Sequence, residues 1–251
     1  MDLSEVLNKV AEGLVAVDSS TTHIGRNQRT GVLYDPGVKT MREPVFVSEL
    51  AQWWESTYPA DFKSTGQPCA CSSSGGGNPE LEHLYDHTPR AKCDLRFSSD
   101  GSEMSSPEWA IEFKHLALVG NNGKNNDFGV AKMLSPYLKD RSLMHDIERM
   151  RDDPQGKKQA VIGYCFEYSF GSLDFAEKIH PSRREVIDNL RDVCSSVDRK
   201  SGIYSPLPLI DFADEIYTNL GLVTPVIKKK FQNAWRHPAG GDGYVFAWQI
   251  L

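Results

Sequence analysis

The sequence predicts an α/β fold in which a central mixed β-sheet is flanked by helices. Apolar and polar residues alternate in two short segments, 91–97 and 109–116, as in strands that turn one face toward a core. A nearly unbroken apolar run at 159–166 has the composition of a strand buried on both faces of a mixed or parallel sheet. Residues 139–152 lie between the second alternating segment and this apolar run, and they repeat apolar side chains at helical spacing. This succession of strands, a helix and a buried strand predicts the class.

The N-terminal part of the chain predicts two helices. Four apolar residues at helical spacing mark the first: Leu3, Leu7, Val10 and Leu14. A polar stretch at 18–43 separates it from a second amphipathic helix at 45–58. Residues 61–78 form the most loop-like segment, with a run of serine and glycine. Residues 79–87 fit either a short helix or the first strand of the sheet, and both interpretations remain open.

The C-terminal part predicts two helices and a final strand. Apolar residues recur at helical spacing in 182–197 and again in 209–220. A glycine-rich turn is expected at 240–243, followed by a strand at 244–251.

The candidate functional residues lie on the two alternating strands. Glu112 and Lys114 stand two residues apart in the second strand, so they project together from one face. Asp94 occupies a polar position of the first strand. The connection contains Asp100-Gly101, a common turn pair. A hairpin would therefore lay the strands side by side and bring Asp94 to Glu112.

Two carboxylates beside a lysine predict a metal site for phosphate chemistry. Mg²⁺ binds through oxygen ligands and keeps several of its waters. The ion lowers the pKa of a bound water and offsets charge on a phosphate. A neighbouring lysine orients the attacking water or stabilises the charge that develops. The three side chains therefore form a minimal phosphodiester-cleaving site.

At these residues the chain resembles the PD-(D/E)xK nuclease superfamily, which includes many restriction endonucleases and DNA-repair nucleases. The match consists of Asp94 followed by Glu112-Phe113-Lys114, with Cys93 where the motif has proline. The resemblance implies a restriction-endonuclease-like core. It also implies that Asp94, Glu112 and the Phe113 backbone carbonyl bind Mg²⁺, with Mn²⁺ as a substitute. Lys114 would be the catalytic lysine.

The first core helix of this superfamily often carries an additional acid. Glu49 is the natural candidate within 45–58. Glu80 and Glu82 compete for the role, because 79–87 fits either a helix or a strand. Each of the three is also interpretable as a solvated surface glutamate.

The resemblance divides the chain into three regions. Residues 1–44 form an N-terminal helix and a polar arm, and residues 45–170 form the nuclease core. Residues 171–251 contribute C-terminal helices and a final strand, which we expect to pack on the same domain.

Nucleic-acid binding by this chain requires local positive charge, because the net charge is −6. We expect DNA contacts from Lys124, Asn125 and Asn126, which follow the strand that carries Lys114. Asparagine and lysine side chains suit base edges and phosphates. Other basic clusters lie at 25–31, 157–158, 183–184 and 228–230.

Cysteine usage and hydropathy predict a cytoplasmic protein with free thiols. The chain has five cysteines, an odd number, and its N-terminus lacks an apolar signal core. No apolar run approaches the length of a membrane span. Cys69 and Cys71, together with His83 and His87, are candidate zinc ligands. The alternative is a loop that binds no metal.

The sequence therefore predicts a Mg²⁺-dependent endonuclease that hydrolyses DNA phosphodiester bonds, as a restriction or phage-defence enzyme. A homodimer is expected, because such enzymes often dimerise to cut both strands. One alternative is a catalytically silent nuclease-like domain that binds nucleic acid or a protein partner. Another is a zinc-stabilised interaction protein. The choice between DNA and RNA stays open.

Overall fold

The computed structural model describes residues 1–64, 77–86, 91–126, 129–137, 141–197 and 200–251. A six-stranded sheet with the order β1-β2-β3-β4-β8-β7 forms its centre. The strands are β1 (Glu80–Leu84), β2 (Lys92–Phe97), β3 (Trp109–His115), β4 (Lys158–Phe166), β7 (Ile227–Ala234) and β8 (Gly241–Gln249). Only β3 and β4 are parallel within this sheet. The predicted α/β class, with a mixed sheet flanked by helices, is confirmed.

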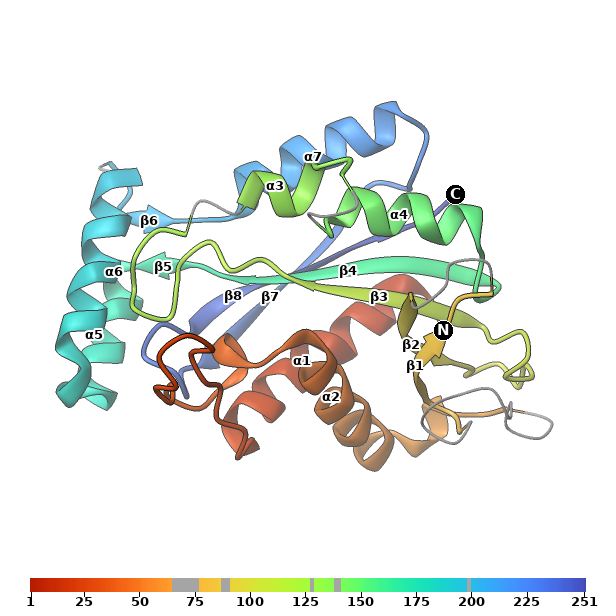
Figure 1. Ribbon diagram of the computed structural model, residues 1–251, viewed down its shortest axis with the longest axis horizontal. Helices are drawn as coiled ribbons and strands as arrows, with labels where there is room; N and C mark the ends of the chain where they lie inside the picture. Colours follow the sequence, from red (N-terminus) through yellow and green to blue (C-terminus); the bar gives the residue numbers. More distant parts are fainter. Residues whose placement is uncertain (65–76, 87–90, 127–128, 138–140, 198–199) are drawn as a thin grey trace.

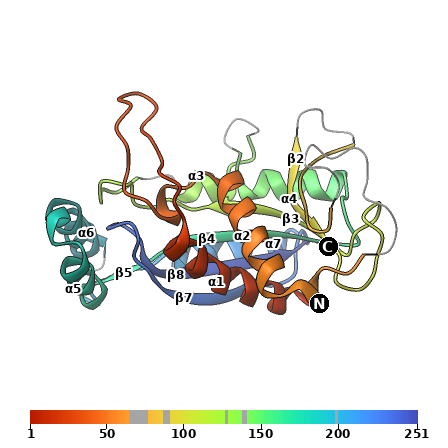
Figure 2. The ribbon, with the colours of Figure 1, turned by 90° about the horizontal axis from the view of Figure 1, so that it is seen from below.

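Helices cover both faces of the sheet (Figures 1 and 2). The helices α1 (Leu3–Ser20) and α2 (Glu43–Thr57) lie on one face. The other face is covered by α3 (Gly129–Leu134), α4 (Leu143–Asp152) and α7 (Leu207–Asn219). A helical hairpin of α5 (Phe170–Ile179) and α6 (Arg184–Val197) lies at one end, beside the short ribbon of β5 (Tyr168–Ser169) and β6 (Ile203–Tyr204).

The first helix packs the N-terminal part of the chain against the C-terminal strands. Asp2 caps α1, and Glu5 completes a reciprocal capping box with it, which satisfies backbone N–H groups of the first turn. The apolar stripe of α1 is buried and packs against β7 and β8. The segments 1–44, 45–170 and 171–251 therefore all contribute to one set of packed layers.

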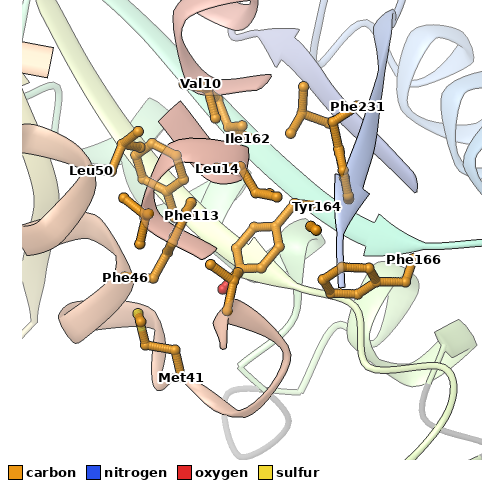
Figure 3. Packing of buried hydrophobic residues seen from close by; sticks show 14 of the residues in the cluster. Val10, Leu14, Met41, Phe46, Leu50, Phe113, Ile162, Tyr164, Phe166 and Phe231 are labelled. Carbon is orange, nitrogen blue, oxygen red and sulfur yellow. The ribbon is translucent and has the colours of Figure 1, made fainter. Parts of the chain in front are cut away.

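The buried strand predicted at 159–166 is β4, at the middle of the sheet. It pairs in parallel with β3 and antiparallel with β8. Its alternate side chains enter two separate cores, with Ile162 and Tyr164 toward α1 and α2 and Val161 toward α4 and α7. Figure 3 shows part of the first core, where the sheet meets α1 and α2.

Several boundaries differ from the predictions. Residues 80–84 form a strand that pairs with β2, so the helical interpretation of 79–87 is wrong there. Helix α4 begins at Leu143 instead of 139, because the Ser142 hydroxyl accepts the His145 N–H and caps the helix. The turn expected at 240–243 is wrong in its last three residues, which begin β8.

Two segments of the C-terminal half were not predicted to form regular secondary structure. Helix α5 was not predicted, and the lysine-rich segment 228–230 belongs to the edge strand β7. The ammonium groups of Lys228 and Lys230 pair with Asp211 and Glu167. Lysines on an edge strand also discourage pairing with other chains.

Among the residues that the structure describes, no helix combines the length and the apolar character needed to cross a bilayer.

Candidate active site

The predicted hairpin forms, and its two strands diverge at Asp94. The ladder between β2 and β3 includes the pairs Phe97 with Trp109 and Leu95 with Ile111. The ladder stops at the next position. There the Phe113 N–H donates to Asp94 Oδ2 at 2.8 Å, so a side-chain oxygen takes the place of a backbone carbonyl as its acceptor. The Asp94 carboxyl also lies close enough to the Glu112 carboxyl for the two to affect each other's pKa. The structure thus brings these two acids together at an opening in the sheet.

Glu112 is held by two residues that the sequence did not single out. Its Oε1 accepts the Tyr85 hydroxyl at 2.7 Å and the Arg149 Nη2 at 2.7 Å. Both contacts use one oxygen, so Oε2 is left for Asp94 or for a cation. Burial raises the pKa of Glu112, and the Asp94 and Asp146 carboxylates raise it further, against the opposing effects of Arg149 and Tyr85.

The Lys114 side chain forms ion pairs with helices on both faces of the sheet. Its Nζ lies 3.3 Å from Glu43 Oε2, at the start of α2, and 3.1 Å from Asp146 Oδ2 in α4. Burial by itself lowers the pKa of Lys114, but the surrounding carboxylates outweigh it and raise the pKa above its ordinary value. Lys114 is therefore an ammonium ion at neutral pH, suited to stabilising negative charge.

We call these six side chains the carboxylate cluster: Asp94, Glu112, Glu43, Asp146, Lys114 and Arg149. Four acids against two bases leave a formal charge of −2 when all are ionised. Burial raises the pKa of Asp94 to about 6, despite the hydrogen bonds from Phe113 and Glu112 and the charge of Lys114. Burial and the neighbouring carboxylates thus disfavour the ionised forms of both Asp94 and Glu112. A divalent cation between them would offset this negative charge and displace protons from the pair as it binds.

The oxygen donors present suit Mg²⁺ better than a metal whose ligands must all come from the protein. Within the described part of the chain, no three or more His, Cys, Asp or Glu side chains are arranged to hold a metal. Asp94 and Glu112 supply two carboxylates. The Phe113 carbonyl lies on the same edge of β3 as its N–H, because both groups of a strand residue point to one side. Mg²⁺ is commonly held by one or two carboxylates and completes its shell with waters.

The upstream acid that the structure brings to the cluster is Glu43, not Glu49. Glu49 Oε1 accepts the Thr21 hydroxyl at 3.1 Å. Glu43 was missed because the helix was predicted to begin at residue 45. A Glu-Pro pair at a helix start is a usable signal, since proline is favoured in the first turn.

The two competing acids of β1 have other partners. Glu80 is buried and lies 3.3 Å from Arg96 and 3.1 Å from His83. Glu82 is exposed and lies 3.3 Å from the Lys92 ammonium. Neither contacts Lys114, so the first is a structural ion pair and the second a surface one.

Access to the cluster runs through a cleft beside Asp94. The cleft has a volume of about 680 Å³ and lies between the first turns of α2 and the strand β1. Its polar lining comes from Arg42, Ser48, Glu49, Gln52, Glu82 and Asp94. Glu49 thus faces the approach to Asp94 without touching the cluster.

The predicted DNA-contact residues lie in a small hairpin after β3. The Asn126 amide donates to the Ala117 carbonyl at 2.8 Å, so it shapes the hairpin. Lys124 and Asn125 are exposed. These two side chains face solvent at the end of β3.

The candidate zinc ligands are only partly described. Cys69, Cys71 and His87 lie outside the described residues. His83 Nδ1 lies 3.1 Å from Glu80 Oε1, within the buried ion-pair group of β1. Free thiols were predicted, and the described cysteines Cys93, Cys165 and Cys194 are free and buried.

No protein-family model, no curated protein and no solved structure matches this chain.

Proposed function

We propose that this chain is a Mg²⁺-dependent endonuclease of the PD-(D/E)xK type that hydrolyses DNA phosphodiester bonds. One observation carries the proposal: the Asp94 and Glu112 carboxyls face each other where β2 and β3 diverge, with the Lys114 ammonium beside them. A buried group of acids with excess negative charge is costly unless a cation completes it. Phosphate chemistry supplies a reason for that arrangement.

The order of elements supports a restriction-endonuclease-like core. The chain runs α2, β1, β2, β3, α4 and β4, with α3 before α4. Asp94 lies on the middle of the three antiparallel strands, and Glu112 and Lys114 lie on the third. Strand β4 then pairs in parallel with β3. This is the sequence of helix, three strands, helix and strand that the resemblance implies.

Each residue of the cluster has a distinct role in the proposed reaction. Asp94, Glu112 and the Phe113 carbonyl would hold Mg²⁺, which would lower the pKa of a bound water and shield the charge of the phosphate. Lys114 would donate hydrogen bonds to the attacking water or to a phosphate oxygen, and its ammonium would offset the negative charge that develops on the phosphate oxygens. Glu43 and Asp146 hold Lys114 in place, and Tyr85 and Arg149 orient Glu112. These four are positioning residues.

The biological role proposed is restriction or phage defence, with a homodimer that cuts both strands. The substrate strand would enter by the cleft that Asp94 lines.

The test uses purified protein with a mixture of plasmid and phage DNA, with and without Mg²⁺ or Mn²⁺. The variants are Glu112→Gln, which keeps the shape of the cluster, and Glu215→Gln, an exposed residue of α7 outside the cleft, as a surface control. We expect metal-dependent cleavage by the wild type and by the control, and a loss of about 10³-fold in Glu112→Gln. Metal-dependent cleavage that survives Glu112→Gln unchanged would contradict the assignment of the site.

A catalytically silent nuclease-like domain is the second candidate. It is favoured by the contacts that Tyr85 and Arg149 already make with Glu112, which is only 3% exposed. In that case Arg149 would stand permanently where a metal is needed. Calorimetric titration with Ca²⁺ distinguishes the two candidates, because only the nuclease predicts binding that is lost in Glu112→Gln.

A further inference from the structure

Lys39 is a buried lysine without an acidic partner. It lies in the short 3-10 helix η1 (Val38–Thr40) between α1 and α2, and its side chain is 4% exposed. The Lys39 Nζ donates to the Val119 carbonyl. No carboxylate of the described residues lies within ion-pair distance, and burial lowers the Lys39 pKa to about 8. A buried ammonium without a counter-charge is unfavourable, so a bound anion would stabilise the charged form of Lys39.

A polar cleft of about 410 Å³ opens beside Lys39. The side chains that shape it include Asn27, Tyr34, His115, Asn121 and Asn122, and its described lining holds no acidic residue. The buried His115 Nε2 has no hydrogen-bond partner in the described part of the chain. The cleft therefore offers donors and a positive charge, and nothing described in its lining repels an anion.

The donor set suits an oxyanion with several acceptor oxygens. An ammonium has three donors, and the Val119 carbonyl uses one of those of Lys39. Lys39 and Asn121 both line the cleft, whose volume is large enough for a tetrahedral phosphate. Hydrogen bonds from a charged donor to phosphate are among the strong ones in proteins.

The cleft adjoins the carboxylate cluster through two segments of the chain. His115 follows Lys114 on β3, and Lys39 lies four residues before Glu43. The His115 ring stacks on Tyr164, with 4.7 Å between the ring centroids. The Tyr164 hydroxyl is buried without a described partner, near the charges of Glu43 and Asp94. Figure 3 shows Tyr164 in the packed core between the sheet and the helices α1 and α2.

We infer that this cleft binds a backbone phosphate of the nucleic acid, next to the phosphate that is cleaved, and that the Lys39 ammonium anchors it. The identity of the ligand as a nucleic acid rests on the proposed function. The anion site itself rests on the burial of Lys39 and the acid-free lining. The loop between α1 and α2, which carries Asn27 and Tyr34, projects from the body of the molecule and forms one wall (Figure 2).

The first experiment measures binding of inorganic phosphate to the metal-free protein at pH 7 by NMR titration. The variants are Lys39→Met, which removes the charge and keeps the length, and Lys178→Met, an exposed lysine of α5 outside the cleft. We expect Lys39→Met to weaken phosphate binding at least tenfold and Lys178→Met to change it less than twofold. Lys39→Met should fold, because replacing an unpaired buried charge by an apolar side chain removes a desolvation penalty.

The second experiment measures the affinity for a DNA duplex in Ca²⁺ at several salt concentrations. A lost phosphate contact should lower the salt-dependence slope by about 1 in Lys39→Met. Lys39-dependent phosphate binding without DNA binding or cleavage would overturn the proposed function and assign the cleft to a free anion. DNA cleavage by the wild type, with phosphate affinity and salt slope unchanged in Lys39→Met, would overturn the inference and leave the nuclease in place.

Discussion

The raised pKa of Asp94 predicts that this proposed metal ligand destabilises the metal-free protein. Folding raises this pKa from 3.8 to about 6, so an ionised Asp94 disfavours the folded state at neutral and alkaline pH. One pKa unit corresponds to about 1.36 kcal/mol, so a shift of about two units gives about 3 kcal/mol. Asp94 is partly exposed at the cleft, and solvent screening reduces the figure to about 2 kcal/mol.

Asp94→Asn should therefore stabilise the metal-free protein at pH 8 by about 2 kcal/mol, or about 4–8 °C in Tm. The asparagine oxygen can still accept the Phe113 N–H, and its amide can donate to Glu112. The sign follows from linkage. Below pH 3.8 Asp94 is protonated in both states and the variant gains nothing; the gain builds up as the pH rises from 3.8 to about 6 and is constant above that.

Thermal unfolding followed by circular dichroism between pH 4 and 8, with and without Mg²⁺, measures this effect. Mg²⁺ should raise the Tm of the wild type and leave that of Asp94→Asn unchanged. Asp211→Asn is a matched exposed control and should shift stability by less than about 0.5 kcal/mol at every pH. A variant that is less stable than the wild type at pH 8, or equally stabilised at pH 4 and pH 8, would refute the reasoning.

Three further predictions concern metal affinity and packing. Tyr85→Phe removes one of the two donors that hold Glu112 Oε1, so affinity for Mn²⁺ measured by calorimetry should fall about tenfold; an unchanged affinity would deny Tyr85 a positioning role. Because Asp94 has a pKa of about 6, Mn²⁺ affinity should fall about tenfold between pH 7 and pH 5, and a flat titration series would count against proton displacement. Gly163→Ala places a methyl group against the Phe246 ring and should cost about 1–3 kcal/mol in denaturant unfolding, whereas no loss would mean that the ring moves freely.

The local pattern of the sequence was sufficient to predict the central strands and the hairpin that pairs the first two of them. The alternation in 91–97 and 109–116 and the apolar run at 159–166 correspond to β2, β3 and β4. These segments carry the periodicity that burial imposes on a sheet. Strand β7 was not predicted, because its lysines hide an alternation that is weak on an exposed edge. Helix α5 carries little apolar periodicity, with two of its residues buried.

The candidate site was predictable only along single strands. Spacing within β3 placed Glu112 beside Lys114, and the hairpin brought Asp94 to them. Asp146 and Arg149 come from a different layer of the fold and are buried by packing against the sheet. In the sequence they belonged to the charged side of a helix, which is usually solvated. Residues that come together from different layers of the fold share no regular spacing in the sequence, so no local pattern predicts them as a group.

The pairing of β4 with β8 has a consequence for the biosynthesis of the protein. Cys165 of β4 contacts Tyr244 of β8, 79 positions later in the chain. During translation β4 can pair with β3 early, but its other edge stays open until β8 has left the ribosome. An apolar strand with a free edge is a template for aggregation. The nascent chain is therefore most prone to aggregation over that interval, and truncation before Gly241 should increase the insoluble fraction of the protein relative to the full chain.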